Sequence, residues 1–217
     1  MSLPAPAELL AAFAGAMRAR RRRWYVFGAQ AAVAYGRPRM TADVDVTVEL
    51  EGAGPPDLVA ELEPHGFELR FPLSQGHLAE ARLLPMVHDP TAMPLDLVIA
   101  GPGLEEEFLA RACPVNVGGV EVPMISVEDL IAVKVLAGRR KDLEDIRGVL
   151  IEQRGRVDLA RMRDVLSALE AAIGEQKLLP RLARLLRAAE REAAGGAKQT
   201  VTPGRRGRQN LEQKRRH

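Results

Sequence analysis

The sequence predicts an α+β protein with a small mixed sheet flanked by helices over residues 1–125, a helical bundle over 126–196, and a disordered basic tail over 197–217. Three observations lead to this prediction. In residues 1–125, short runs that are either apolar or alternate between apolar and polar residues are separated by Gly and Pro. Apolar residues at helical spacing occupy the second part, and the last residues lack apolar periodicity.

Each element of the first part rests on a local pattern. Helical spacing of apolar residues over 6–20 predicts an amphipathic helix, and the aromatic and β-branched run at 24–27 predicts a buried strand that ends at Gly28. Residues 43–50 alternate acidic or hydroxyl residues with valine, which is the period of a strand. The other expected elements are helices at 29–35, 57–65 and 104–112, and strands at 67–71, 80–87, 95–100, 114–117 and 120–123, with His77 in a turn.

The second part is predicted to be helical from Ser126 onward. Ser126 and Asp129 form a capping box that opens the first helix. Breaks at glycines divide the remainder, so we expect helices over 126–138, 142–153, 158–172 and 178–193.

Composition and charge exclude several classes of protein. The 217 residues are 47% hydrophobic and 28% charged, as in ordinary globular proteins. The absence of a long apolar run or a signal-peptide pattern predicts a cytoplasmic protein without a membrane partner. The single cysteine, Cys113, excludes an intramolecular disulfide and is expected in the core. The net charge is +2, although residues 198–217 alone carry +6.

Three aspartates form the strongest chemical pattern. Asp43 and Asp45 are two residues apart in a predicted strand, so their side chains share one face. Asp96 stands alone in the apolar strand LDLVIA, where an unpaired charge is costly to bury. If the two strands are neighbours, three carboxylates converge and form a site suited to Mg²⁺, with room for two ions. The alternative is that Asp43 and Asp45 lie on a solvated sheet face and Asp96 caps a turn.

The order of these motifs resembles a known family. Gly28-Ala29, then Asp43-Val44-Asp45, then Leu95-Asp96-Leu97 is similar to the G-[GS], D-x-[DE] and h-D-h signature of the nucleotidyltransferase superfamily, which has the DNA polymerase beta-like fold. The stretch from Lys134 to Ile146 resembles the K-x-x-A-x-R-x-K-D-x-x-D element of the bacterial AbiEii-like branch, which includes toxins of toxin–antitoxin systems.

The resemblance implies roles for individual residues. Asp43, Asp45 and Asp96 are the expected catalytic metal ligands, and Asp96 is also expected to polarise the acceptor hydroxyl. Lys134 is expected to touch the triphosphate of ATP or another nucleotide, and Asp145 to orient a basic partner or the acceptor. The full set of expected nucleotide-binding residues is Gly28, Ala29, Arg37, Arg39, Lys134, Lys141 and Asp145. Ala29 replaces the usual Gly or Ser and offers only backbone N–H groups to a phosphate.

The predicted activity is Mg²⁺-dependent transfer of a nucleoside monophosphate from a nucleoside triphosphate (NTP) to a hydroxyl acceptor. By resemblance the acceptor is either a tRNA 3′ end, with an antitoxin protein as partner, or a small molecule such as an antibiotic. The basic tail favours tRNA or another RNA, because Lys and Arg neutralise phosphates. The rival hypothesis is a catalytically inactive binding or antitoxin-like module that keeps the fold, and Ala29 is the residue that favours it.

Overall fold

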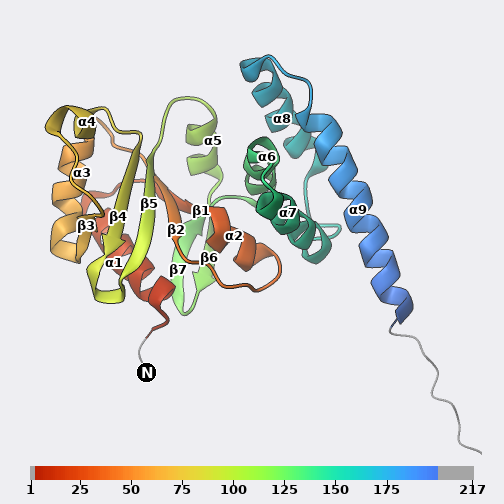
Figure 1. Cartoon of the computed structure of the whole chain (residues 1–217), viewed down its shortest axis with the longest axis horizontal. Coiled ribbons are helices and arrows are strands. Elements are labelled where there is room, and N and C mark those ends of the chain that lie inside the picture. Colours follow the sequence, from red (N-terminus) through yellow and green to blue (C-terminus); the bar gives the residue numbers. More distant parts are fainter. Residues whose placement is uncertain (1–2, 200–217) are drawn as a thin grey trace, which may run out of the picture.

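Within residues 3–199, which are those that the computed structural model describes, seven strands form one mixed sheet (Figure 1). Its order is β3-β4-β5-β2-β1-β7-β6. Parallel pairs join β2 to β5 and β1 to β7, while the other neighbours are antiparallel. The strands are β1 (Trp24–Phe27), β2 (Val44–Val48), β3 (Phe67–Leu69), β4 (Leu83–His88), β5 (Met93–Ile99), β6 (Cys113–Val117) and β7 (Val120–Met124). The predicted mixed sheet is therefore confirmed.

Helices cover the sheet and then continue as the C-terminal part of the described chain. They are α1 (Ala5–Arg20), α2 (Gly28–Tyr35), α3 (Pro55–Leu62), α4 (Gln75–Ala79), α5 (Leu104–Arg111), α6 (Val127–Ala137), α7 (Arg140–Glu152), α8 (Leu159–Ile173) and α9 (Leu178–Gln199), with 3-10 turns at Glu63–His65 and Asp89–Thr91. Helix α2 contacts both β1 and β2 on one side and α6 and α7 on the other. It therefore joins the sheet to the helical part of the chain (Figure 1).

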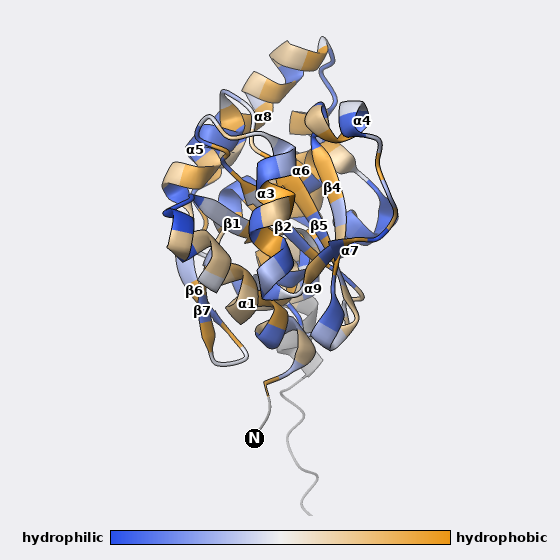
Figure 2. Ribbon diagram, turned by 90° about the vertical axis from the view of Figure 1, so that its left-hand side faces the viewer, coloured by the Kyte–Doolittle hydropathy of each residue, from blue (hydrophilic) through white to orange (hydrophobic). Residues whose placement is uncertain are grey.

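The core forms where the sequence patterns place apolar residues. The stripe on α1 is buried, and Phe13 packs edge to face against Trp24 and Phe67, with ring centroids 5.0 and 5.8 Å apart. Val44 and Val46 lie in the same strand as Asp45, and both side chains are fully buried. Figure 2 shows hydrophobic and hydrophilic residues alternating along the surrounding helices, as expected when one face of each helix packs inward. Across residues 3–199, no helix has both the length and the apolar character needed to cross a membrane.

Some local predictions differ from the structure. His77 lies in the short helix α4, whose start is capped by Ser74 Oγ accepting the His77 N–H at 3.3 Å. Cys113 is exposed, because it begins β6 at the edge of the sheet. Helix α9 continues past the predicted end at residue 193, to Gln199. Of the tail predicted over 197–217, residues 200–217 lie outside the described residues. The domain boundary at 125/126 stays a prediction.

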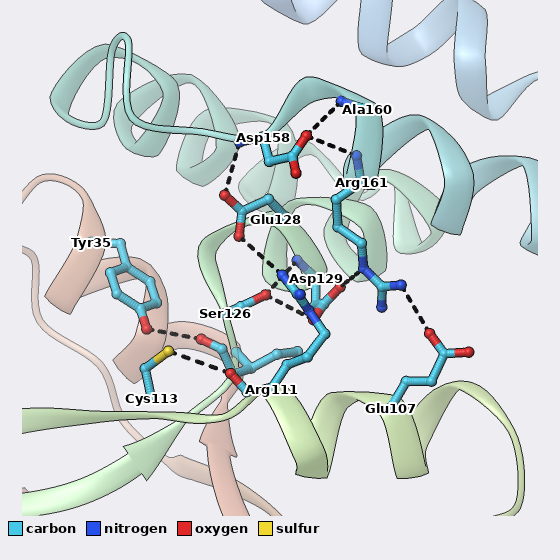
Figure 3. A network of polar contacts seen from close by, with 11 residues as sticks. Tyr35, Glu107, Arg111, Cys113, Ser126, Glu128, Asp129, Asp158, Ala160 and Arg161 are labelled. Atoms are coloured by element: carbon cyan, nitrogen blue, oxygen red, sulfur yellow. Dashed lines mark hydrogen bonds and ion pairs between the residues drawn. The ribbon is translucent and has the colours of Figure 1, made fainter.

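A buried ionic cluster ties α5, α6 and α8 together (Figure 3). The fully buried carboxylate of Asp129 accepts hydrogen bonds from Ser126 Oγ at 2.7 Å and Arg111 Nε at 3.1 Å. It also accepts one from Arg161 Nε at 3.0 Å, and Arg161 Nη1 donates to Glu107 Oε2 at 2.9 Å. Because Arg111 and Glu107 belong to α5, this cluster fixes α6 and α8 against the helix that follows β5.

Candidate active site

The three aspartates singled out by the sequence line one cavity. Parallel pairing of β2 with β5 places Asp45 directly opposite Asp96, and Asp43 precedes β2 by one residue. Neighbouring residues in register project from the same face of a sheet, so the two strands present their carboxylates together. All three line a cavity of about 160 Å³ whose wall also includes Gly28 and Lys134. The three aspartates thus share one cavity, and their role as metal ligands stays a prediction.

Gly28 makes room for Asp45 at the start of α2. Its backbone has φ of +64°, a conformation that favours glycine, and a Cβ atom there would overlap the Asp45 carboxylate. The backbone N–H of Ala29 favours the ionised form of that carboxylate and so lowers its pKa. Contact of the Ala29 N–H with a phosphate stays a prediction.

The electrostatics of the cavity favour a positive ligand. Burial raises the pKa of Asp45, and the nearby Asp43 and Asp96 carboxylates raise it further. The Ala29 N–H and the Lys134 ammonium oppose this rise without cancelling it. The charge on Asp45 is therefore incompletely compensated by the protein, and a cation beside it would stabilise the ionised form.

The donor chemistry fits Mg²⁺, but the carboxylates are not gathered into a closed metal site. Carboxylate oxygens are the ligands that Mg²⁺ prefers, and it completes its octahedron with water and phosphate oxygens. In the described part of the chain, no group of three or more His, Cys, Asp or Glu side chains is arranged to hold a metal ion. One cause is visible at Asp96, whose Oδ1 is paired with the guanidinium of Arg70.

Opposite the aspartates, Lys134 anchors a second ionic cluster. Its ammonium donates to Asp145 Oδ2 at 2.8 Å and lies 3.3 Å from Asp142 Oδ1. Arg39 holds Asp145 through two hydrogen bonds of 2.9 Å, and Arg139 holds Asp142 through bonds of 2.6 and 3.2 Å. Burial opposes ionisation of both aspartates, yet these hydrogen bonds and the charge of Lys134 leave the pKa of each below its ordinary value.

This cluster forms across a helix break. Gly138 ends α6 with φ of +63°, and α7 begins at Arg140, so Lys134 and Asp145 are not on one continuous helix. The break lies where the sequence predicts it, and packing of α6 against α7 brings the two side chains together. Lys141 is exposed and lines the cavity, while Asp145 pairs with Lys134 and Arg39 instead of Lys141.

A larger cavity of about 400 Å³ adjoins the first. Arg39, Lys141 and Asp145 line both cavities. Arg37, predicted to contact the nucleotide, lines only the larger one and pairs with Glu192 of α9 at 3.1 Å. Glu192 also accepts a 2.6 Å hydrogen bond from Arg147, which lies on the same wall. Arg37 is thus near the aspartate cavity without being part of it.

Four residues at or next to these cavities were not singled out from the sequence. Asp142 and Arg139 belong to the K-D-x-x-D stretch, so the motif contained the signal, but no role was assigned to them. Arg70 pairs with Asp96 and Glu192 lines the larger cavity, each from a distant segment that no local pattern marks.

The family described as nucleotidyltransferase of unknown function (DUF6036) matches residues 16–184, and the chain belongs to this family. Membership of the AbiEii-like branch stays a prediction. No protein in a search of curated proteins matches this chain.

Two solved structures of one protein share the fold. The solution structure of the antibiotic-resistance factor ANT(2″)-Ia is 17% identical, with a TM-score of 0.56, and the match covers 78% of this chain and 93% of that one. The crystal structure of ANT(2″)-Ia in complex with adenylyl-2″-tobramycin is 18% identical, with a TM-score of 0.53 and coverage of 78% and 99%. At these identities the likeness concerns the fold.

Proposed function

We propose that this chain transfers a nucleoside monophosphate from an NTP to a hydroxyl group of a small acceptor molecule, in a reaction that depends on Mg²⁺. The observation that carries the proposal is the cavity in which Asp43, Asp45 and Asp96 face Lys134 beside the Gly28 turn. Membership of a nucleotidyltransferase family supports the reaction class.

In the proposed reaction Asp43 and Asp45 hold the cations that carry the triphosphate. Bound there, Mg²⁺ would offset charge on the phosphates and on the attacking and leaving oxygens. Asp96, paired in register with Asp45 on the neighbouring strand, would help to hold the catalytic cation and accepts the proton of the acceptor hydroxyl. The acceptor oxygen forms a bond to the α-phosphorus, the bond from the α-phosphorus to the bridging oxygen breaks, and pyrophosphate leaves.

Lys134 is placed to bind the triphosphate. Two of its three N–H donors are directed to Asp142 and Asp145, which fixes the ammonium at the cavity wall. The third donor remains for a phosphate oxygen. Arg39 and Arg139 hold the two aspartates from the outer side, so their role is to position Lys134.

The larger cavity supports a small-molecule acceptor. Its volume of about 400 Å³ lies within the usual range for small-ligand sites, and it is continuous in its lining with the aspartate cavity. ANT(2″)-Ia, which shares the fold, has been crystallised with an adenylylated aminoglycoside. The tRNA acceptor, the toxin-like role and the antitoxin partner implied by the resemblance stay predictions, because the basic tail that favoured RNA lies largely outside the described residues.

Thermal unfolding tests the nucleotide-binding half of the proposal. A ligand at about 100 times its dissociation constant adds roughly 2.7 kcal/mol to stability. For a chain of this size that is a rise of about 5–10 °C in melting temperature. We expect such a rise with Mg²⁺ and at least one NTP, and its loss in Asp45→Asn.

Asp164→Asn is the matched control, since it neutralises an exposed aspartate on α8 and should keep the wild-type shift. A wild-type melting curve that does not move with any of the NTPs at millimolar concentration contradicts the proposal.

A further inference from the structure

Arg70 lies on a row of residues that runs straight across the sheet. Its N–H donates to the Pro85 carbonyl at 2.9 Å, which extends the pairing of β3 with β4 by one residue. Pro85 is opposite Asp96 in β5, and Asp96 is opposite Asp45 in β2. Arg70 therefore approaches the aspartate cavity from the far side of β4.

Pro85 lets the Arg70 side chain reach Asp96. In an antiparallel strand the backbone nitrogen and carbonyl of a residue point to the same side, so those of Pro85 face β3. Pro85 and Asp96 then form a pair without mutual hydrogen bonds, the kind in which side chains stand closer. The guanidinium of Arg70 passes over this buried proline and pairs with Asp96 Oδ1.

This ion pair occupies an oxygen that the proposed function needs. Among the described residues, Arg70 is the one cation that forms an ion pair with Asp43, Asp45 or Asp96. Its side chain is 37% exposed and that of Asp96 is 30% exposed, so the guanidinium can leave for solvent without a large packing change. Within the described part of the chain, Asp45 beside it has no ion-pair partner.

We propose that Arg70 is a built-in counter-cation for Asp96 that competes with divalent metal for this carboxylate. The inference rests on the proposed function, because it concerns the same three aspartates. With Arg70 in place, the free protein holds a divalent cation weakly, and a cation that arrives with a triphosphate has the phosphate oxygens as additional ligands. Arg70 is thus a positioning residue that couples occupation of Asp96 to the presence of nucleotide.

Mn²⁺ binding to the full chain without nucleotide tests the competition, with free Mn²⁺ measured by its EPR signal. Removal of a positive charge within contact distance of the carboxylate should tighten Mn²⁺ binding in Arg70→Gln by about tenfold or more. Arg70→Lys keeps the charge and should stay near the wild-type affinity. Adding Asp96→Asn to Arg70→Gln should abolish the gain.

Arg82→Gln is the matched control, because Arg82 pairs with Glu105 at 3.2 Å outside the cavity lining. Unchanged Mn²⁺ affinity in Arg70→Gln, or an equal gain in Arg82→Gln, overturns the proposal. Melting curves of each variant confirm that it is folded, and Arg70→Lys provides the comparison if Arg70→Gln is not. If the wild type shows the NTP-dependent thermal shift while Arg70→Gln binds Mn²⁺ like wild type, this inference fails and the proposed function stands. If neither Mn²⁺ nor NTP binds any variant, both fail.

Discussion

Replacing Asp45 with Asn is expected to abolish nucleotidyl transfer and to weaken nucleotide binding at the same time. Burial and the neighbouring carboxylates raise the pKa of Asp45, so its charge is the one that the site must compensate with a cation. Loss of a single preorganised charge-stabilising group costs a factor on the order of 10²–10³ in rate. Removal of a carboxylate that binds the catalytic cation should lower kcat/KM by at least the same factor.

Asp96→Asn provides the contrast within the same assay. Asp96 is proposed to accept the proton of the acceptor hydroxyl. In Asp96→Asn, kcat should therefore fall by a factor on the order of 10² or more, while NTP affinity stays within about tenfold of wild type. Equal losses of affinity in both variants would show that the three carboxylates do not divide their work in this way. Wild-type turnover by Asp96→Asn would remove that residue from the site.

The second large effect is expected in stability, from Asp129→Ala. The carboxylate is fully buried and accepts hydrogen bonds from Arg111 and Arg161, so its removal leaves two guanidinium groups without their shared partner. Arg161 Nη2 is already buried without a hydrogen-bond partner among the described residues, so loss of Asp129 would leave a second nitrogen of this guanidinium, Nε, without its partner. Breaking a buried ion pair from one side costs about 3–5 kcal/mol.

Urea unfolding of the wild type and of two variants measures this loss. Asp158→Ala is the control, because exposed Asp158 only caps α8 by accepting the N–H groups of Ala160 and Arg161. Loss of a helix cap costs about 1 kcal/mol. A decrease in unfolding free energy for Asp129→Ala no larger than that for Asp158→Ala would show that the buried cluster does not hold α6 and α8 in place.

Local patterns were sufficient to predict the strands that carry the aspartates. The alternation in residues 43–50 fixes which side chains face the core, and Val44 and Val46 are indeed buried. The pairing of β2 with β5 could not be read from either strand alone, because a parallel partner depends on the crossover between them and not on the sequence of the strand. The sequence therefore left this pairing as a condition of the predicted site.

Residues contributed by distant segments were the ones that sequence reasoning missed. Arg70 reaches Asp96 across an intervening strand, and Glu192 reaches Arg37 from the last described helix. Such contacts follow from tertiary packing, which local periodicity does not encode. Asp142 is a different case: it lies inside a recognised motif, but its complete burial beside Lys134 and Arg139 depends on how α7 turns after Gly138.

The most direct test of the account is transfer of label from α-labelled NTP by the wild-type protein, with Mg²⁺ and with aminoglycosides or total tRNA as acceptors. We expect label to appear on a hydroxylated small molecule and pyrophosphate to be released in equal amount. Both signals should vanish in Asp45→Asn. Label on tRNA alone would support nucleotidyl transfer but contradict the proposal that the acceptor is a small molecule. Absence of label on every acceptor, together with no thermal shift by any NTP, would contradict the central claim that these three aspartates form a nucleotidyltransferase site.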